Sequence, residues 1–288
     1  RTIKSLRRHL TLIGARGRSI GFVPTMGYFH SGHLSLMRKA KKENGIVVVS
    51  LFVNPMQFGP REDLAKYPRD LGRDAAMARG EGVDILFVPS VEEMYPGLSD
   101  MKGGIATIEV PVVSEGLCGM SRPGHFRGVA TVVGKLLNIV RPDAMYLGQK
   151  DAQQVAVLKK MVRDLNFSVR IRVGKTVREP DGLAMSSRNS YLSTSERSEA
   201  ALLYAALRRA KSLVAKGELD AKKIIFEIKK LLLEGTGASI EYISCVTATD
   251  LRPVRRISGQ ILIALAVKFP SARLIDNIVV NCNDAANR

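Results

Sequence analysis

Residues 21–36, which read G-F-V-P-T-M-G-Y-F-H-S-G-H-L-S-L, constrain the fold of this chain more than any other stretch. An apolar run that ends at Pro24 predicts a buried strand, and the turn-rich residues 25–32 predict a loop. Residues 33–42 predict a helix that begins directly after the loop. A helix start exposes unpaired backbone N–H groups and the positive end of the helix dipole, so this strand–loop–helix unit predicts a phosphate site.

Two of the four histidines of the chain, His30 and His33, lie where this helix begins. Gly27 and Gly32 accompany them, and glycine lets a backbone approach a ligand closely. A zinc site is disfavoured, because a helical metal pair needs i, i+4 spacing and no cysteine or carboxylate lies close in the sequence. The alternative is a core strand followed by two incidental loop histidines. The glycine-flanked pair favours a ligand-binding role.

Apolar and amphipathic segments alternate through the first 176 residues. The segments that predict strands are 19–24, 45–53, 84–89, 144–148 and 168–173, with an outlying strand at 105–110. Those that predict helices are 1–15, 33–44, 70–80, 128–140 and 152–166. This order predicts an α/β fold with a doubly wound, Rossmann-like parallel sheet and a ligand at the carboxyl ends of its strands.

The pattern changes after residue 176. Two amphipathic helices are predicted at 193–216 and 220–233, the first capped by Ser193 or Thr194 with Glu196 nearby. They precede three segments that predict an antiparallel sheet, 240–249, 260–269 and 273–280. We therefore expect a nucleotide-binding domain at 1–176 and a smaller α+β domain at 177–288, with a hinged cleft between them.

The composition is that of a water-soluble protein, with 45% hydrophobic and 25% charged residues. No apolar run reaches the length of a membrane span, so we expect no membrane association. The three cysteines lie far apart, which favours reduced thiols and a cytoplasmic location. Because the chain begins with Arg1, we expect a native Met and a short strand to precede it.

The segment Asn54-Pro55-Met56-Gln57-Phe58-Gly59 directly follows the second buried strand. Gln57 is therefore expected at a carboxyl end, facing the same crevice as the histidines. Its amide offers a donor and an acceptor to a small ligand that carries hydroxyl and carboxylate groups. A turn with a solvated glutamine is the alternative, and the sequence leaves both open.

Gly148-Gln149-Lys150-Asp151 marks a second junction of strand, turn and helix. Lys150 at the helix start is placed to reach a phosphate, and Asp151 to cap the helix or hold a water or ribose group. Gln154 lies one helical turn further along the same side. A solvated surface charge is the alternative for Lys150.

Residues 181–189 read D-G-L-A-M-S-S-R-N. The hydroxyls of Ser186 and Ser187, followed by the guanidinium of Arg188, suit the binding of pyrophosphate oxygens. A serine-rich loop is ordinarily a linker, but the position of this one at the domain boundary favours a mobile lid over a nucleotide.

Pro24-Thr25-Met26-Gly27 followed by His30-Ser31-Gly32-His33 resembles the His-x-Gly-His signature of the nucleotidyltransferase-like superfamily, in the extended form of the pantothenate synthetase (pantoate–β-alanine ligase) family. The Gly-x-Lys-Asp junction and the serine loop are similar to motifs of that family and follow in the same order. The serine loop is also similar to the Met-Ser-Lys-Ser loop of related adenylating enzymes, with Arg188 in place of Lys. The resemblance extends from the opening helix to Ile278.

This resemblance implies an ATP-dependent condensation of pantoate with β-alanine, through pantoyl adenylate, to pantothenate, AMP and pyrophosphate. It also implies Mg²⁺ as cofactor and a homodimer as the assembly. The implied catalytic residues are His30, His33, Lys150 and Arg188. The implied ATP-binding residues are Pro24, Thr25, Met26, Gly27, His30, Gly32, His33, Gly148, Lys150, Asp151, Val177, Met185, Ser186, Ser187 and Arg188. The implied contacts with pantoate or β-alanine are Met26, Gln57 and Gln154.

Some residues depart from the family pattern. Tyr28 and Phe29 replace a small residue and Leu, which is expected to crowd the loop beside the pocket. The acidic residue that aligns with Asp74 lies near magnesium in the family, so Asp74 is the expected metal residue. Arg73 stands where some relatives have a second acid. For His125, which precedes another predicted helix, structural, dimer-facing and catalytic roles stay open.

Two other functions compete with this one. Another adenylyltransferase of the same superfamily would lack the motif at residues 54–59, and a tRNA ligase would need more chain. A nucleic-acid-binding protein is suggested by the net charge of +17, of which residues 1–50 contribute +9. The absence of Trp and an aromatic content of 6% disfavour nucleic acid, because RNA-binding modules stack bases on aromatic rings.

Overall fold

The computed structural model describes residues 2–14, 17–60, 62–98 and 104–282. They belong to two compact units. Unit 1 comprises Arg1–Ser114, Arg122–Gln149 and Val157–Lys175, and unit 2 comprises Glu115–Ser121, Lys150–Ala156 and Thr176–Arg288. We retain the division into residues 1–176 and 177–288 as a proposal for the domains, with the addition that two short earlier segments pack with unit 2.

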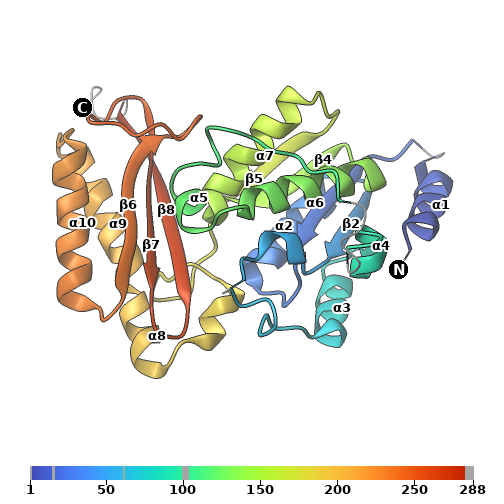
Figure 1. Cartoon of the computed structure of the whole chain (residues 1–288), viewed down its shortest axis with the longest axis horizontal. Coiled ribbons are helices and arrows are strands. Elements are labelled where there is room, and N and C mark those ends of the chain that lie inside the picture. The colour runs from blue at the N-terminus through green and yellow to red at the C-terminus, as the bar shows by residue number, and fades with distance from the viewer. Residues whose placement is uncertain (1, 15–16, 61, 99–103, 283–288) are drawn as a thin grey trace. The chain divides into compact units, whose positions relative to one another are not determined.

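Unit 1 is built, within its described residues, on five parallel strands in the order β3-β2-β1-β4-β5 (Figure 1). The strands are β1 (Ile20–Thr25), β2 (Ile46–Leu51), β3 (Ile85–Phe87), β4 (Ala144–Gly148) and β5 (Arg170–Gly174). The chain moves outward from β1 to β3 and returns to β4 on the other side of β1. The predicted doubly wound sheet is confirmed, and the strand order reverses between β1 and β4, where such sheets bind ligands.

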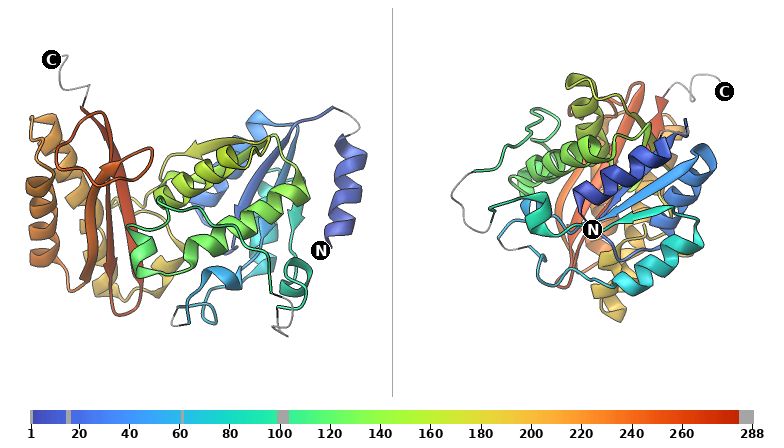
Figure 2. Two further views of the ribbon diagram at one scale, coloured as in Figure 1. Left: turned by 45° about the horizontal axis from the view of Figure 1, so that its top comes forward. Right: turned by 90° about the vertical axis from the view of Figure 1, so that its right-hand side faces the viewer.

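The longer helices of unit 1 follow the predicted segments. They are α1 (Ile3–Gly14), α2 (Ser31–Glu43), α3 (Leu71–Gly80), α6 (His125–Val140) and α7 (Ala152–Asp164), of which α7 begins within unit 2. Leu36, Met37 and Ala40 of α2 pack on alternate residues of the sheet, such as Val47 and Val49 of β2. Helix α1 packs against α6 (Figure 2). These contacts bury the central strands on both faces, as their continuous apolar sequences predict.

Several details of the predicted elements were wrong. Helix α6 begins at His125 rather than at residue 128, with Gly124 as its N-cap, so His125 lies in the helix rather than before it. Residues 105–110 form no strand; the N–H of Ile108 donates to Oγ1 of Thr131 on α6 instead of to a neighbouring strand. Helix α2 begins at Ser31 rather than at residue 33, because His30 is its N-cap. The predicted helix 193–216 is two helices, α8 (Thr194–Ala200) and α9 (Leu202–Ala215), with Ala201 between them. The predicted cap of α8 is confirmed, since Ser193 and Glu196 form a capping box.

In the described part of unit 2, three strands form an antiparallel sheet in the order β6-β7-β8. The strands are β6 (Ser239–Thr247), β7 (Gln260–Lys268) and β8 (Arg273–Asn281), and both pairings are antiparallel as predicted. Helices α9 and α10 (Ala221–Gly235) cover one face, where alternate residues of β7 from Ile261 to Val267 point (Figure 1).

The opposite face of this sheet is covered by the two segments that come from earlier in the chain. Val246, Leu262 and Ala264 pack there against Leu117 and Ala152. Gln153 joins the two segments, because its Oε1 accepts from Cys118 N at 2.9 Å and its Nε2 donates to Gly116 O at 2.7 Å. Strand β7 is therefore buried on both faces, and residues 115–121, which include α5 (Cys118–Ser121), are part of this core.

Candidate functional site

The start of α2 is closed by two histidines that cap it reciprocally. His30 is the N-cap in extended conformation, and its Nδ1 accepts from Gly32 N at 3.1 Å. The Nδ1 of His33 accepts from His30 N at 3.4 Å, and the two rings lie 4.1 Å apart between centroids. Ser or Thr with Glu or Gln ordinarily fills these two positions. The histidines thus complete the helix start that the sequence predicts as a phosphate site.

This capping fixes the proton positions on both rings. Each donor is a backbone N–H, so each Nδ1 acts as an acceptor without a proton. A neutral imidazole that accepts through Nδ1 carries its proton on Nε2. His30 and His33 therefore present Nε2–H groups, which are hydrogen-bond donors suited to anionic oxygens.

The loop before the histidines is held by Asp74. Its Oδ2 accepts from Tyr28 N at 2.6 Å and its Oδ1 from Phe29 N at 2.7 Å, and the residue is 1% exposed. Gly27 has a φ of +88°, and a Cβ there would lie 3.0 Å from Asp74 Oδ2. The sequence associated Asp74 with a metal; in the structure both of its oxygens accept backbone N–H groups.

Gln57 lies in η1 (Pro55–Gln57), beside Met26 of the histidine loop. Its Nε2 donates to Met26 Sδ at 2.9 Å and its Oε1 accepts from Asn54 Nδ2 at 3.2 Å. Asn54 also donates to the carbonyl of Gly128 at 3.1 Å and accepts from the hydroxyl of Tyr95 at 3.0 Å. Gln57 therefore lies beside a residue of the histidine loop and is only 8% exposed, which disfavours the alternative of a solvated glutamine.

His125, the third histidine that the sequence analysis considered, holds the backbone of Gln57. Arg122 donates to His125 Nε2 at 2.9 Å, so Nδ1 of His125 carries the proton and donates to Gln57 O at 2.8 Å. Arg122 also pairs with Glu62 at 2.6 Å. Burial alone would raise the pKa of Glu62, but the Arg122 guanidinium holds it below its usual range. Of the roles left open for His125, this geometry favours the structural one.

Lys150 is the first residue of the second segment of unit 2 and lies in η2 (Gln149–Asp151). Its ammonium lies 3.6 Å from Asp151 Oδ1, and its backbone carbonyl accepts from Asn277 Nδ2 at 2.8 Å. Gln154 lies one turn into α7 and is partly exposed. The lysine backbone is therefore held by a strand far along the chain, which no local sequence pattern indicates.

The serine loop of unit 2 begins as a short hairpin. Arg178 and Ala184 form an antiparallel bridge, and Met185 N donates to Val177 O at 3.0 Å. Ser186 then caps η3 (Ser187–Tyr191), where its hydroxyl accepts from Arg188 N at 3.2 Å. At the residues predicted to bind phosphate, the predicted lid forms a turn of 3-10 helix.

The structure places the predicted residues in two groups, one in each unit. Unit 1 holds Pro24, Thr25, Met26, Gly27, His30, Gly32, His33, Gln57, Asp74 and Gly148. Unit 2 holds Lys150, Asp151, Gln154, Val177, Met185, Ser186, Ser187 and Arg188. Residues to which the sequence assigned no role support both groups: Asn54, which opens the Gln57 motif, and Tyr95 in unit 1, and Arg178, Asp276 and Asn277 in unit 2.

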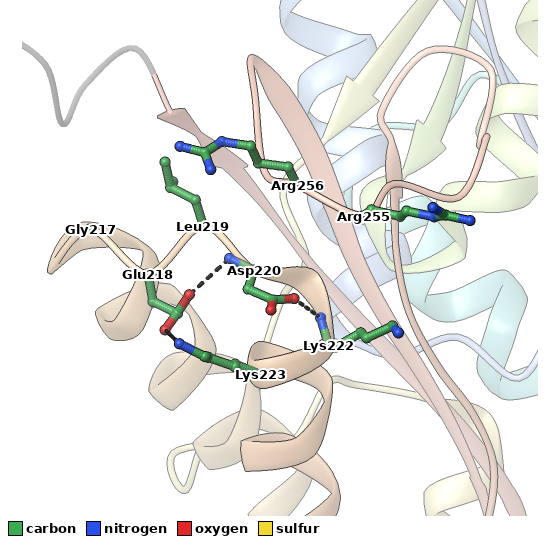
Figure 3. Close-up of a pocket in the computed structure, with 8 residues that line it drawn as sticks. All are labelled: Gly217, Glu218, Leu219, Asp220, Lys222, Lys223, Arg255 and Arg256. Carbon is green, nitrogen blue, oxygen red and sulfur yellow. Dashed lines mark hydrogen bonds and ion pairs between the residues drawn. The ribbon is translucent and has the colours of Figure 1, made fainter.

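An open pocket of about 540 Å³ lies elsewhere in unit 2, at the start of α10 (Figure 3). It is lined by Gly217, Glu218, Leu219, Asp220, Lys222, Lys223, Arg255 and Arg256. Asp220 caps α10 and Glu218 pairs with Lys223 at 3.4 Å, so its acids serve the helix start. It includes none of the predicted site residues.

Metal-binding clusters and membrane-spanning helices are both absent from the described residues. No group of three or more His, Cys, Asp and Glu residues there could hold a metal ion. Within the same residues, no helix is both long and apolar enough to cross a membrane.

Known proteins resemble this chain along nearly its whole length. The family model described as pantoate-beta-alanine ligase matches residues 1–279. The chain belongs to the pantoate–β-alanine ligase family. A relative named pantothenate synthetase, from Moorella thermoacetica, is 51% identical over 284 residues, which cover 98% of each chain. The predicted family and its class, a carbon–nitrogen ligase, are confirmed.

Solved structures of pantoate–β-alanine ligases agree with the fold. A pantothenate synthetase from Thermus thermophilus is 43% identical with a TM-score of 0.90, over 96% of this chain and 97% of its own. A pantoate-beta-alanine ligase from Francisella tularensis, complexed with beta-gamma ATP and beta-alanine, is 37% identical with a TM-score of 0.77, over 96% of this chain and 95% of its own. The predicted fold class is confirmed by these likenesses.

Proposed function

We propose that this chain condenses pantoate with β-alanine at the expense of ATP, giving pantothenate, AMP and pyrophosphate. The observation that carries the proposal is the His30–His33 cap, which gives a phosphate-binding helix start two oriented Nε2–H donors. Membership of the ligase family supports the substrates, as does the relative that was crystallised with beta-gamma ATP and beta-alanine. The other adenylyltransferases and nucleic-acid binding are not favoured.

The chemistry proceeds in two steps. A carboxylate oxygen of pantoate attacks the α-phosphorus of ATP, the bond to the bridging oxygen breaks, and pyrophosphate leaves. The amine of β-alanine then attacks the acyl carbon of pantoyl adenylate; AMP leaves with the electron pair, and the amine loses a proton. Positioning and charge neutralisation supply most of the acceleration in such phosphate chemistry.

Unit 1 supplies the donors for the first step. His30 and His33 donate through Nε2 to oxygens of the α-phosphate as charge builds in the transition state. Pro24, Thr25, Gly27, Gly32 and the backbone at Gly148 line the nucleotide. Met26 and Gln57 contact pantoate, and the short contact between them keeps the amide and the histidine loop together.

Unit 2 supplies cations and hydroxyls. Lys150, Ser186, Ser187 and Arg188 bind the β- and γ-phosphates, for which ammonium, hydroxyl and guanidinium groups are suited. Asp151 binds the ribose, the backbone at Val177 and Met185 contacts the adenine side, and Gln154 orients pantoate. His30, His33, Lys150 and Arg188 are the proposed catalytic residues.

Magnesium enters this proposal as part of MgATP. The described residues do not form a protein-held metal site, because Asp74 is buried and directs both oxygens to N–H groups. Mg²⁺ needs few protein ligands when phosphates supply the others. We propose that Asp74 lies near the bound Mg²⁺, as the resemblance implies, and that its role is to hold the loop there through Tyr28 N and Phe29 N. We further propose a homodimer and a cytoplasmic location, as the resemblance implies.

Pyrophosphate exchange into ATP tests the function. The enzyme is incubated with MgATP and labelled pyrophosphate, and with pantoate, β-alanine or neither. Exchange that requires pantoate alone is expected, because adenylate formation precedes the amine. Exchange with another carboxylate but not with pantoate would assign a different acceptor, and a folded protein without exchange would refute the adenylate route.

A further inference from the structure

Strand β8 carries two buried polar residues in an otherwise apolar run. Asp276 and Asn277 are 2% and 5% exposed, respectively, within the sequence L-I-D-N-I-V-V. Neighbouring residues of a strand point to opposite faces of its sheet. Asp276 pairs with Leu265 on the face covered by α9 and α10, whereas Asn277 pairs with Ala264 on the face covered by residues 150–156.

Asp276 fixes the hairpin that leads into the serine loop. Arg178 donates to both carboxylate oxygens, at 2.6 and 3.0 Å, and to the carbonyl of Gly182 at 3.0 Å. Its guanidinium also lies 3.6 Å from the centroid of the Tyr204 ring. Burial raises the pKa of Asp276, and the hydrogen bonds from Arg178 oppose that rise. The hairpin thus has a rigid side chain at its base.

Asn277 fixes the other phosphate-binding segment. Its Nδ2 donates to the carbonyl of Lys150 at 2.8 Å, and its N–H donates to Asp276 Oδ1 at 2.7 Å. Two consecutive residues of β8 therefore hold different segments on opposite faces of the sheet. Asn277 holds Lys150, and Asp276 holds the hairpin before Ser186.

Stability alone does not account for these residues. A buried ion pair contributes little net stability, and apolar residues of similar volume are often at least as stable. Buried polar groups are instead suited to fixing one arrangement. We propose that Asp276 and Asn277, which we name the β8 anchor, are positioning residues that set Lys150 and the Ser186–Arg188 turn in the register needed to bind the phosphates of ATP. This inference rests on the proposed roles of those residues in ATP binding.

Direct binding of ATP to the full-length protein tests the anchor, by calorimetry with MgATP alone. Asn277→Ala removes the hydrogen bond to Lys150 without leaving a buried charge. Asp276→Asn keeps the shape of the carboxylate but weakens its hold on Arg178. The matched control is Ile228→Val, which removes one methylene from the core of unit 2 on α10. Thermal unfolding of each variant is measured alongside.

We expect Asn277→Ala to weaken MgATP binding about 5- to 10-fold, the size of one lost hydrogen bond. In steady-state kinetics the KM for ATP should rise by a similar factor while the KM for pantoate stays within about 2-fold. Ile228→Val should lower the unfolding temperature without changing ATP affinity. Unchanged ATP affinity in folded Asn277→Ala, or losses in all variants that follow their unfolding temperatures, would overturn the anchor. Failure of pantoate-dependent exchange in the wild type would instead refute the proposed function, since ATP binding is measured without pantoate.

Discussion

The guanidinium of Arg73 lies over the ring of Tyr28, 4.9 Å from its centroid, and donates to the carbonyl of Phe29 at 3.0 Å. Tyr28 has a φ of +52°, a backbone conformation that residues other than glycine rarely adopt. Arg73 and its neighbour Asp74 thus contact the same two loop residues, one through a carbonyl and a ring, the other through N–H groups. Arg73 thus contacts both residues that were expected to depart from the family pattern in this loop, the ring of Tyr28 and the backbone of Phe29.

Replacing Arg73 should loosen the loop that carries the histidines. We expect Arg73→Ala to lower kcat/KM for pantoate-dependent pyrophosphate exchange about 5- to 30-fold, since a part-buried hydrogen bond and a cation–π contact each contribute roughly 0.5–1 kcal/mol. Arg79→Ala, on the exposed last turn of the same helix, is the control and should have no effect. Equal rates for the two variants would show that Arg73 does not position the loop.

The two histidines can be tested separately as caps and as donors. Asn is a strong N-cap and Gln suits the third helical position, so the double variant His30→Asn, His33→Gln keeps a capping pair without imidazole. We expect its unfolding temperature to stay near that of the wild type while exchange falls at least about 100-fold, because one oxyanion donor alone is worth about 100- to 1000-fold. His33→Ala should lose both activity and stability. Near-normal adenylate formation by either variant would contradict the donor role.

Two glycines of α6 provide a matched pair for the Gln57 site. A Cβ at Gly128 would lie 2.3 Å from Met56 O and 2.7 Å from Gln57 N, which are backbone atoms. A Cβ at Gly134 would lie 2.4 Å from Ile108 Cδ1, the end of a flexible side chain. Gly128→Ala should therefore destabilise the protein by roughly 1–3 kcal/mol and raise the KM for pantoate. Gly134→Ala should stay within about 1 kcal/mol of the wild type, since the helix preference for Ala offsets the contact. Urea unfolding measures the stability of each variant, and steady-state kinetics measures its KM for pantoate. A similar loss of stability in the two variants would contradict the backbone clash at Gly128.

The carboxylate of Glu196 should make unit 2 sensitive to acid. It accepts from Ser271 Oγ at 2.6 Å and from Ser193 N at 2.7 Å, and these hydrogen bonds, foremost that from Ser271, lower its pKa from 4.5 to about 2. A carboxyl whose pKa is lower in the folded state stabilises that state above its unfolded pKa and loses the contribution as pH falls towards the folded value. The stabilisation by Glu196 is therefore complete above about pH 5 and declines between 4.5 and 2.

Urea midpoints of the wild type and Glu196→Gln at pH 7 and pH 3 check this expectation. The variant should be less stable at pH 7, and the difference from the wild type should shrink at pH 3. Glu234→Gln, at an exposed site on α10, is the control. A difference that is the same at both pH values would contradict the assignment.

Periodicity in the sequence was sufficient to predict the sheet of unit 1, because strands buried on both faces read as continuous apolar runs such as I-V-V-V in β2. It was insufficient at residues 105–110, where the pattern comes from packing on α6 rather than from pairing with a strand. The start of α2 was missed by two residues because histidine is an unusual capping residue. The contacts of Asp276 and Asn277 join residues about 100 or more positions apart, so no local pattern reveals them. An adjacent polar pair inside an apolar strand was the one available indication.

The burial of β7 on both faces affects how the chain folds during synthesis and where it can be cut into fragments. One face is covered by helices that follow residue 200, and the other by residues 115–121 and 150–156. During synthesis these segments leave the ribosome before the strand that they cover exists, so they await a partner made later. A fragment that starts at residue 177 would lack them and expose Val246, Leu262 and Ala264 to water. We therefore expect a single cut at residue 176 to leave the second half with an uncovered sheet face, and an engineered unit 2 to be more stable when the two earlier segments are joined to it.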